Sequence, residues 1–89
     1  MPGPQRAEDA QYEIVEGNAI IIDSAGTEVV TLNELGTLVW QRLDGGHDVG
    51  SLAGELGARF DDVPTQQLED DVRTFLKDLQ DSKLIVGRF

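Results

Sequence analysis

The sequence predicts a single α+β domain in which a three-stranded antiparallel sheet is followed by three helices. Three observations lead to this prediction. Short runs rich in isoleucine and valine alternate with glycine-containing turns over residues 11–32. Beyond that point, apolar residues recur at spacings of three and four, which is typical of amphipathic helices. The chain has 89 residues and no cysteine, so we expect one domain without disulfides or thiolate metal ligands.

The three expected strands lie within about residues 11–32. They are, in order, Tyr12–Glu16, Ala19–Asp23 and Thr27–Leu32, with turns at Gly17-Asn18 and Ser24–Gly26. Strands of this length joined by such short turns form an antiparallel meander. Residues 1–10 contain two prolines and a glycine without periodicity, and we expect them to form a flexible tail ahead of a domain spanning residues 11–89.

Three helices are expected over about residues 32–43, 49–60 and 64–80. Thr31 and Glu34 have the spacing of a capping box for the first helix. Asp48 is the expected cap of the second helix, and Pro64 fits the first turn of the third. The run Lys83–Val86 then predicts a short closing strand. A helix followed by a strand late in a small domain is the order of a winged helix-turn-helix, so the expected fold is winged helix-turn-helix-like.

The charge of the chain favours a basic polypeptide as its partner. Seven basic residues face seventeen acidic ones, which gives a net charge of -10. Binding to a nucleic-acid backbone depends on lysine and arginine, so we expect no nucleic-acid partner. The longest apolar run is Ala19–Ile22, too short to cross a membrane, and the N-terminus has no apolar signal segment. A cytoplasmic protein without a membrane partner is therefore expected.

No catalytic constellation is visible in the sequence. His47 is the only histidine and lies between two expected helices, where it serves as a turn residue. Glu69, Asp70 and Asp71 are consecutive on a helix, so their carboxylates fan out around it and do not converge. Trp40 lies beside the apolar stripe of the first helix and is expected at the edge of the core. We therefore expect no enzymatic activity, no metal and no cofactor.

An ordered set of motifs resembles the pyrroloquinoline-quinone synthesis protein D (PqqD)-like domains. In that pattern, a Leu-Asn pair opens a helix that ends in Asp-Gly, as Leu32-Asn33 and Asp44-Gly45 do here. A second helix carries apolar residues at the positions of Val49, Leu52 and Leu56. A third has the form Asp-Val-x-x-Phe-Leu-x-x-Leu, matched by residues 71–79. The resemblance covers about residues 12–85, almost the whole chain.

The resemblance implies a non-catalytic RiPP recognition element, which binds the leader segment of a ribosomally made precursor peptide. In that family the leader adds as a strand on the third strand of the sheet, beside the third helix. The residues expected to contact it are Thr27, Glu28, Val29, Val30, Thr31, Gln67, Leu68, Asp71, Val72 and Phe75. A chain of this length most resembles the leader-binding component of lasso peptide biosynthesis. That component implies a leader peptidase as a partner, with a cyclase as a further candidate.

Two questions stay open in the sequence. The apolar stripe of the third helix has Gln67, Asp71, Thr74 and Asp78 on one side and Glu69 and Arg73 on the other, and either flank can face the peptide. The alternative functions are a winged-helix DNA-binding regulator, a PqqD-type chaperone of quinone cofactor biosynthesis, and an acidic scaffold for a basic protein. Leu43 stands where a Cys commonly precedes Asp-Gly in PqqD itself, which favours the broader leader-binding role over quinone biosynthesis.

Overall fold

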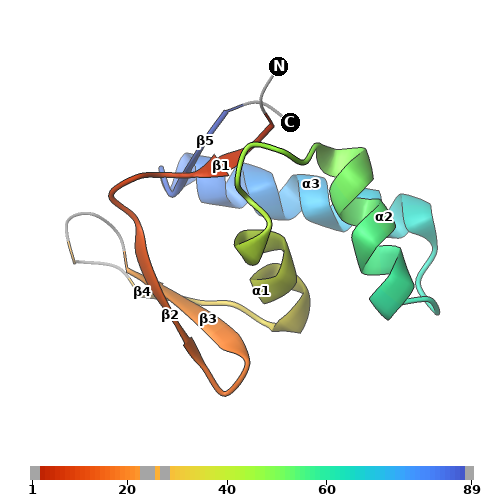
Figure 1. Ribbon diagram of the computed structural model, residues 1–89, viewed down its shortest axis with the longest axis horizontal. Helices are drawn as coiled ribbons and strands as arrows, with labels where there is room; N and C mark the ends of the chain where they lie inside the picture. Colours follow the sequence, from red (N-terminus) through yellow and green to blue (C-terminus); the bar gives the residue numbers. More distant parts are fainter. Residues whose placement is uncertain (1–2, 23–25, 27–28, 88–89) are drawn as a thin grey trace.

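The computed structural model describes residues 3–22, 26 and 29–87 and confirms the expected fold class. The elements are β1 (Gln5–Arg6), β2 (Gln11–Val15), β3 (Asn18–Ile22), β4 (Val29–Thr31), α1 (Glu34–Gln41), α2 (Val49–Arg59), α3 (Thr65–Asp81) and β5 (Ile85–Val86). The strands β2, β3 and β4 form an antiparallel sheet in that order, and β1 pairs with β5 in a second, two-stranded sheet. The three helices gather on one side of the larger sheet, where α1 contacts β3 (Figure 1).

The β2–β3 hairpin turns at Glu16 and Gly17, one residue earlier than expected. Both residues have positive φ, at 53° and 83°, which is the backbone of a type I′ turn. Val15 consequently pairs with Asn18, and Ile14 pairs with Ala19. Side chains alternate between the faces of a sheet, so this register places Tyr12 and Ile14 on the same inner face as the buried Ala19 and Ile21.

The hydrogen-bond register shows which backbone groups face the open edges of the sheet. The Ala19 carbonyl accepts from the Leu32 N–H at 2.8 Å, so Ala19 and, two residues on, Ile21 bond toward β4. In this register Val30 bonds to β3, and Val29 and Thr31 direct their N–H and C=O groups away from it. By the same alternation, Tyr12 and Ile14 direct their N–H and C=O groups away from β3, at the opposite edge of the sheet.

Helix α1 begins later than the capping box predicts. Asn33 is the N-cap, and its Oδ1 accepts from the Gly36 N–H at 2.8 Å. Thr31 remains in β4, paired with Ile20, so it is not available as a cap. Glu34 does not reach back along the chain, because its carboxylate contacts the Arg59 guanidinium of α2 at 2.8 Å. The sheet ladder and this ion pair therefore set the start of α1, in place of the local motif.

The other two helices follow the sequence closely. Asp48 caps α2 as expected, and its Oδ1 accepts from the Ser51 N–H at 2.8 Å. Helix α3 begins directly after Pro64. Its apolar stripe packs against α2, and Leu68, Val72, Leu76 and Leu79 on that stripe are buried. The expected periodicity is thus sufficient to locate both helices.

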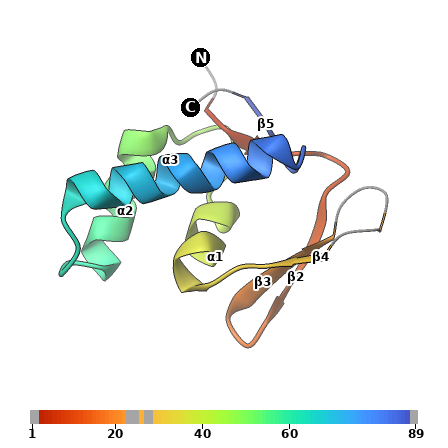
Figure 2. The same ribbon diagram turned by 180° about the vertical axis from the view of Figure 1, so that it is seen from behind.

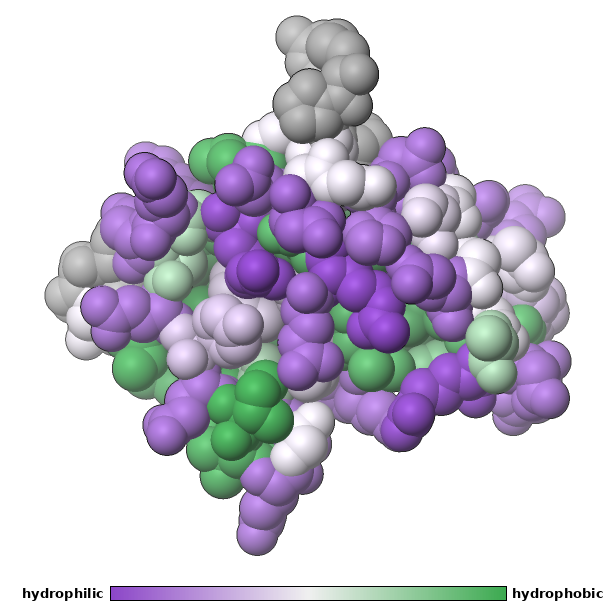
Figure 3. All heavy atoms as spheres, in the orientation of Figure 1, coloured by the Kyte–Doolittle hydropathy of each residue, from purple (hydrophilic) through white to green (hydrophobic). Residues whose placement is uncertain are grey.

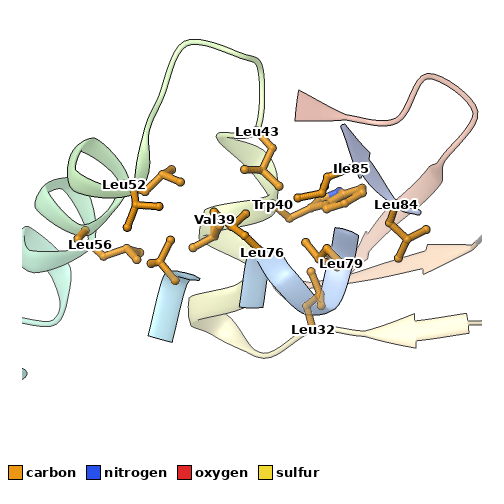
Figure 4. Close-up of a cluster of buried hydrophobic side chains, with 14 of the residues drawn as sticks. Leu32, Val39, Trp40, Leu43, Leu52, Leu56, Leu76, Leu79, Leu84 and Ile85 are labelled. Atoms are coloured by element: carbon orange, nitrogen blue, oxygen red, sulfur yellow. The ribbon is translucent and has the colours of Figure 1, made fainter. Parts of the chain in front are cut away.

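Trp40 is at the centre of the core and not at its edge. Its side chain is fully buried in a cluster that joins the sheet and all three helices (Figure 4). The Tyr12 ring meets it edge-on with centroids 5.5 Å apart, and Arg6 Nη1 donates to the Trp40 carbonyl at 2.7 Å. Trp40 Nε1 is buried and finds no acceptor among the described residues. Leaving such a donor without a partner costs roughly 1–3 kcal/mol, which the packing of the large ring offsets.

Residues 3–10 do not form the flexible tail that the composition predicts. The strand β1 pairs with β5, Gly3 N–H donates to the Gly45 carbonyl at 2.8 Å, and Ala7 N–H donates to the Leu84 carbonyl at 2.9 Å. Pro4 is fully buried. The partners of this segment come from the far end of the chain and from the α1–α2 loop, so a local sequence pattern does not reveal them. The expected closing strand is present as β5.

Candidate functional site

The strand β4 forms an open edge of the larger sheet. Among the described residues it has β3 as its only strand neighbour, and the N–H and C=O groups of Val29 and Thr31 point away from β3. The Val29 side chain is 64% exposed on the outer face, whereas Val30 is half-buried and packs against the core. We call this row of backbone groups the β4 edge. Thr27 and Glu28, expected in the same strand, lie outside the described residues.

A groove continues from the end of β4, between the start of α1 and the side of α3. Figure 2 shows the chain leaving β4 and entering α1 next to α3. The groove has a volume of about 320 Å³, and its lining consists of Asn33, Leu35, Gly36, Asp71, Thr74, Phe75 and Asp78. We call it the α1–α3 groove. Asn33 follows the last residue of β4 by only two residues, so the groove begins close to the end of the β4 edge.

Gly36 allows the apolar wall of the groove to form. A Cβ at this position would lie 3.3 Å from Phe75 Cε1 and 3.2 Å from Asn33 Oδ1, which is tighter than ordinary contact. The absent side chain lets the half-buried Phe75 ring approach α1 closely. Leu35, also half-buried, adds to the same apolar surface. The wall of the groove is therefore suited to an aliphatic side chain.

The charge of the groove is negative. Asp71 and Asp78 are exposed on the flank of α3 that lines it, with Thr74 between them. None of the described residues that line it is basic. The sequence leaves open which flank of α3 faces the site, and the structure places the Asp71 flank there. Two carboxylates beside an apolar wall favour a guest that carries both an aliphatic and a cationic side chain.

The expected contact residues fall into three groups in the structure. Val29, Val30, Thr31, Asp71 and Phe75 lie on the β4 edge or in the α1–α3 groove. Leu68 and Val72 are fully buried in the core, so the expectation that they contact a peptide is wrong for the described structure. Gln67 is exposed one turn before Asp71 and is not part of the groove lining.

Sequence reasoning missed the contribution of α1 to the site. Asn33, Leu35 and Gly36 line the groove, and none of the three is among the expected contact residues. The clue available in the sequence is the Leu-Asn pair at the start of α1, because a short polar cap next to Gly36 leaves room for a neighbouring helix. The approach of α3 to that point depends on tertiary packing and is not encoded in a local pattern.

The only histidine has a structural role. His47 Nε2 lies 2.6 Å from Glu55 Oε2, and His47 Nδ1 lies 3.3 Å from Asp44 Oδ1. The pKa of the Asp44 carboxyl is lowered, first by the hydrogen bond that it accepts from the Gly46 N–H and second by its contact with His47. These contacts join the α1–α2 loop to α2. His47 thus contacts two carboxylates, which agrees with the expectation that it orders a turn.

The described residues hold no group of three or more His, Cys, Asp or Glu side chains that are placed to bind a metal ion. Across the same part of the chain, no helix has both the length and the apolar character that a membrane crossing requires.

Comparison with solved structures supports the fold. The structure of TbiB1 in complex with the TbiA(beta) leader peptide matches with a TM-score of 0.84 and 18% sequence identity, over 96% of this chain and 98% of that one. The structure of a lasso peptide synthetase B1 complexed with the leader peptide matches with a TM-score of 0.82 and 19% identity, over 94% of this chain and 98% of that one. At such low identity these matches establish a shared fold.

Comparison at the level of sequence identifies the family. A search of the curated proteins finds no match. The family model for the coenzyme PQQ synthesis protein D (PqqD) matches residues 18–85, which run from the start of β3 to the first residue of β5. This range includes β4, α1 and α3, and hence every part of the β4 edge and the α1–α3 groove. The chain therefore belongs to the coenzyme PQQ synthesis protein D (PqqD) family.

Proposed function

We propose that the chain is a non-catalytic RiPP recognition element that binds the leader segment of a ribosomally made precursor peptide. The observation that carries the proposal is the open β4 edge together with the α1–α3 groove, whose lining begins two residues after β4. Both similar solved structures are complexes with leader peptides, which supports an extended peptide as the occupant. The leader is then added as a further strand next to β4, beside α3.

The backbone of β4 supplies the part of the interaction that depends least on sequence. The N–H and C=O groups of Val29 and Thr31 are directed to the open side, so each residue can exchange two hydrogen bonds with an antiparallel or parallel guest. A hydrogen bond of this kind contributes roughly 0.5–1.5 kcal/mol. Thr27 and Glu28 precede β4 in the chain, and in our proposal they extend the same contact.

The α1–α3 groove supplies selectivity. Alternate side chains of an added strand point to the same face, so one set is directed into the groove. An aliphatic leader side chain packs against Phe75 and Leu35, and a neighbouring Lys or Arg meets Asp71 or Asp78. Gln67 continues the Asp71 flank by one turn and is a candidate contact at the end of the groove.

The proposed role includes presentation of the bound leader to enzymes. We propose a leader peptidase as the acting partner, and a cyclase as a further one, in lasso peptide biosynthesis in the cytoplasm. The recognition element supplies no catalytic group in this scheme, and it needs no cofactor. Its contribution is to hold the precursor in an extended conformation, which lowers the entropy lost when the peptidase binds the cleavage site.

Fluorescence polarisation with a labelled synthetic leader tests the proposal. The leader is taken from the precursor reading frame next to the gene, and a scrambled leader of equal composition is the control. We expect saturable binding in the micromolar range or tighter for the native order only. Absence of binding by protein shown to be folded contradicts the proposal. Equal binding of the scrambled peptide would show that binding depends on charge alone and not on the leader sequence.

Two further ligands separate the alternatives. A precursor peptide of quinone biosynthesis, used as an unlabelled competitor, should displace the lasso leader poorly if the role lies in lasso biosynthesis. Duplex DNA at moderate salt should not bind, because α3 presents acidic residues where phosphates would approach. Retention of a specific DNA sequence would instead support a transcriptional regulator.

A further inference from the structure

In the described part of the chain, the larger sheet has a second open edge at β2, on the side opposite β4. All five residues of β2 are exposed, and the backbone N–H and C=O groups of Tyr12 and Ile14 point away from β3. The strand contains no proline and no lysine, its pairing with β3 has no bulge, and its one charged residue, Glu13, is on the outer face, so it has few of the devices that prevent edges from pairing with other chains. Tyr12, Ile14 and Val15 are 41%, 41% and 44% exposed. We call this row of backbone groups the β2 edge.

A hollow of about 440 Å³ lies next to this edge, between the tip of the β2–β3 hairpin and α1. Ile14, Glu16 and Asn18 line it from the hairpin, and Glu34, Leu38 and Gln41 line it from α1. The α1 residues differ from those that line the α1–α3 groove, so the two sites use different faces of the helix. Figure 3 shows apolar side chains gathered over the hairpin. We call this site the hairpin hollow.

We propose that the β2 edge and the hairpin hollow together form a second docking surface, which takes an extended segment of a partner protein bearing a Lys or Arg side chain. A strand added to the β2 edge directs alternate side chains to the same face as Tyr12 and Ile14, which is the face toward α1. A side chain from that set enters the hairpin hollow. The main-chain ladder gives affinity, and the hollow selects the side chain.

The charges of the hairpin hollow favour a cationic side chain. Glu16 and Glu34 are acidic, and Arg59 is the only basic residue among the described residues that line the hollow. Arg59 Nε and Nη2 lie 2.9 and 2.8 Å from Glu34 Oε1, so these two charges offset each other and Glu16 supplies the remaining negative charge. Glu16 has no recorded ion-pair partner in the described part of the chain. The aliphatic stem of a Lys or Arg can pack along Ile14 and Leu38, with its charged end toward Glu16.

A second copy of this chain fits the surface poorly. On the face toward α1, the β2 edge offers only Tyr12 and Ile14, neither of which is cationic. The net charge of -10 also opposes self-association. A basic partner protein can supply the cationic side chain, and the negative charge of this chain attracts it. Because β2 and β4 are the opposite edges of one sheet, occupation of the β2 edge leaves the β4 edge free, and the proposal does not depend on leader binding.

Amide exchange measured by NMR on the full-length protein tests this surface. The probe is a synthetic peptide that alternates valine with lysine, and the control peptide alternates valine with glutamate. We expect the lysine peptide to slow exchange of the Tyr12 and Ile14 amides, both in the native chain and in Val29→Pro, which impairs the β4 edge. Protection confined to Val29 and Thr31, or no protection at all, overturns the proposal.

A pair of charge variants separates docking in the hairpin hollow from general attraction to an acidic protein. Glu16→Gln removes a carboxylate that lines the hollow, and we expect it to weaken the lysine peptide about twofold to fivefold, as for an exposed ion pair. Glu13→Gln removes an equal charge from the outer face of the same strand and should have no effect. Equal weakening by both variants contradicts the proposal, as does a protein dimer that protects β2 without peptide.

Discussion

Asp71 is the residue whose position in the structure most narrows the function. The sequence places it on either of two possible flanks of α3, and the structure brings it to the α1–α3 groove with Asp78 and Phe75. Phe75 and Asp71 are therefore predictable as lining residues of the groove from the helical pattern and the family resemblance. Leu68 and Val72 are not, because the pattern that marks an apolar stripe does not show which of its residues the rest of the fold covers.

The substitution Asp71→Asn tests the electrostatic part of recognition. We expect it to weaken binding of a leader that carries Lys or Arg about twofold to fivefold, and to reduce the dependence of Kd on salt, since an exposed ion pair is lost. Fluorescence polarisation at several salt concentrations measures both effects. Asp70→Asn is the matched control, because Asp70 is exposed on the same helix outside the groove lining. Equal effects of both variants would show that the leader does not enter the groove.

Asp44 gives the protein a specific dependence on pH. Its pKa lies below the ordinary value of 3.8 in the folded chain, mainly because the carboxylate accepts a hydrogen bond from the Gly46 N–H. A carboxyl group with a lowered pKa stabilises the fold above its unfolded pKa, and this stabilisation is lost as pH falls through the folded pKa. Asp44→Asn should therefore reduce the stability of the fold at neutral pH. The variant should also lose less stability than the native protein as the pH falls below 3.8.

Urea unfolding at a series of pH values measures this effect. Asp61→Asn serves as the control, because Asp61 is exposed and has no recorded hydrogen bond in the described part of the chain. If the stability of Asp44→Asn falls in acid as steeply as that of the native protein, the contacts of Asp44 with Gly46 and His47 do not persist in solution.

At the scale of the elements, the sheet has two open edges that differ in their surroundings. The β4 edge continues into an acidic groove with an apolar wall, and the β2 edge lies beside the hairpin hollow. The existence and order of the three strands are predictable from the alternation of apolar runs and turns, and the family resemblance implies that a peptide adds to the third strand. The start of α1 is not, because Leu32 and Thr31 are retained by the sheet against a local motif that favours an earlier helix.

A pair of proline substitutions identifies the edge that takes the leader. Val29→Pro removes an N–H that is directed to the open side of β4, and we expect leader affinity to fall about tenfold, which corresponds to the loss of one ladder hydrogen bond. Ile14→Pro removes the equivalent group from β2 and should leave leader affinity unchanged. Leader binding by fluorescence polarisation, with folding checked by circular dichroism, measures both. The reverse result would place the leader on the β2 edge.

At the scale of the whole molecule, the N-terminal segment fastens the two ends of the chain together. It pairs with β5, bonds to the α1–α2 loop and buries Pro4, so it belongs to the domain. Composition predicts a tail here because proline and glycine are frequent and no periodicity is visible. The error has a physical cause: this segment is ordered by contacts that are distant in sequence.

Removal of residues 1–7 should destabilise the fold. The deletion eliminates the β1–β5 ladder and the hydrogen bonds from Gly3, Arg6 and Ala7, each worth roughly 0.5–1.5 kcal/mol, and it uncovers apolar side chains. We expect a loss of at least about 2 kcal/mol, a large share of the stability of so small a domain. Thermal unfolding measures the change. A shorter deletion of residues 1–2 keeps these contacts and is the control, and equal melting temperatures for both would contradict the role of β1.

The pairing of β1 with β5 also brings residues 3 and 87 side by side, since a Cβ on Gly87 would lie 2.7 Å from the Gly3 carbonyl oxygen. A short peptide linker between the termini would thus convert the chain into a ring without distorting the β1–β5 pairing. Circularisation restricts the denatured ensemble far more than the native fold, so the cyclic product should melt at a higher temperature than the linear one. New termini opened at the Glu16–Gly17 turn would then yield a permuted protein whose β4 edge is untouched.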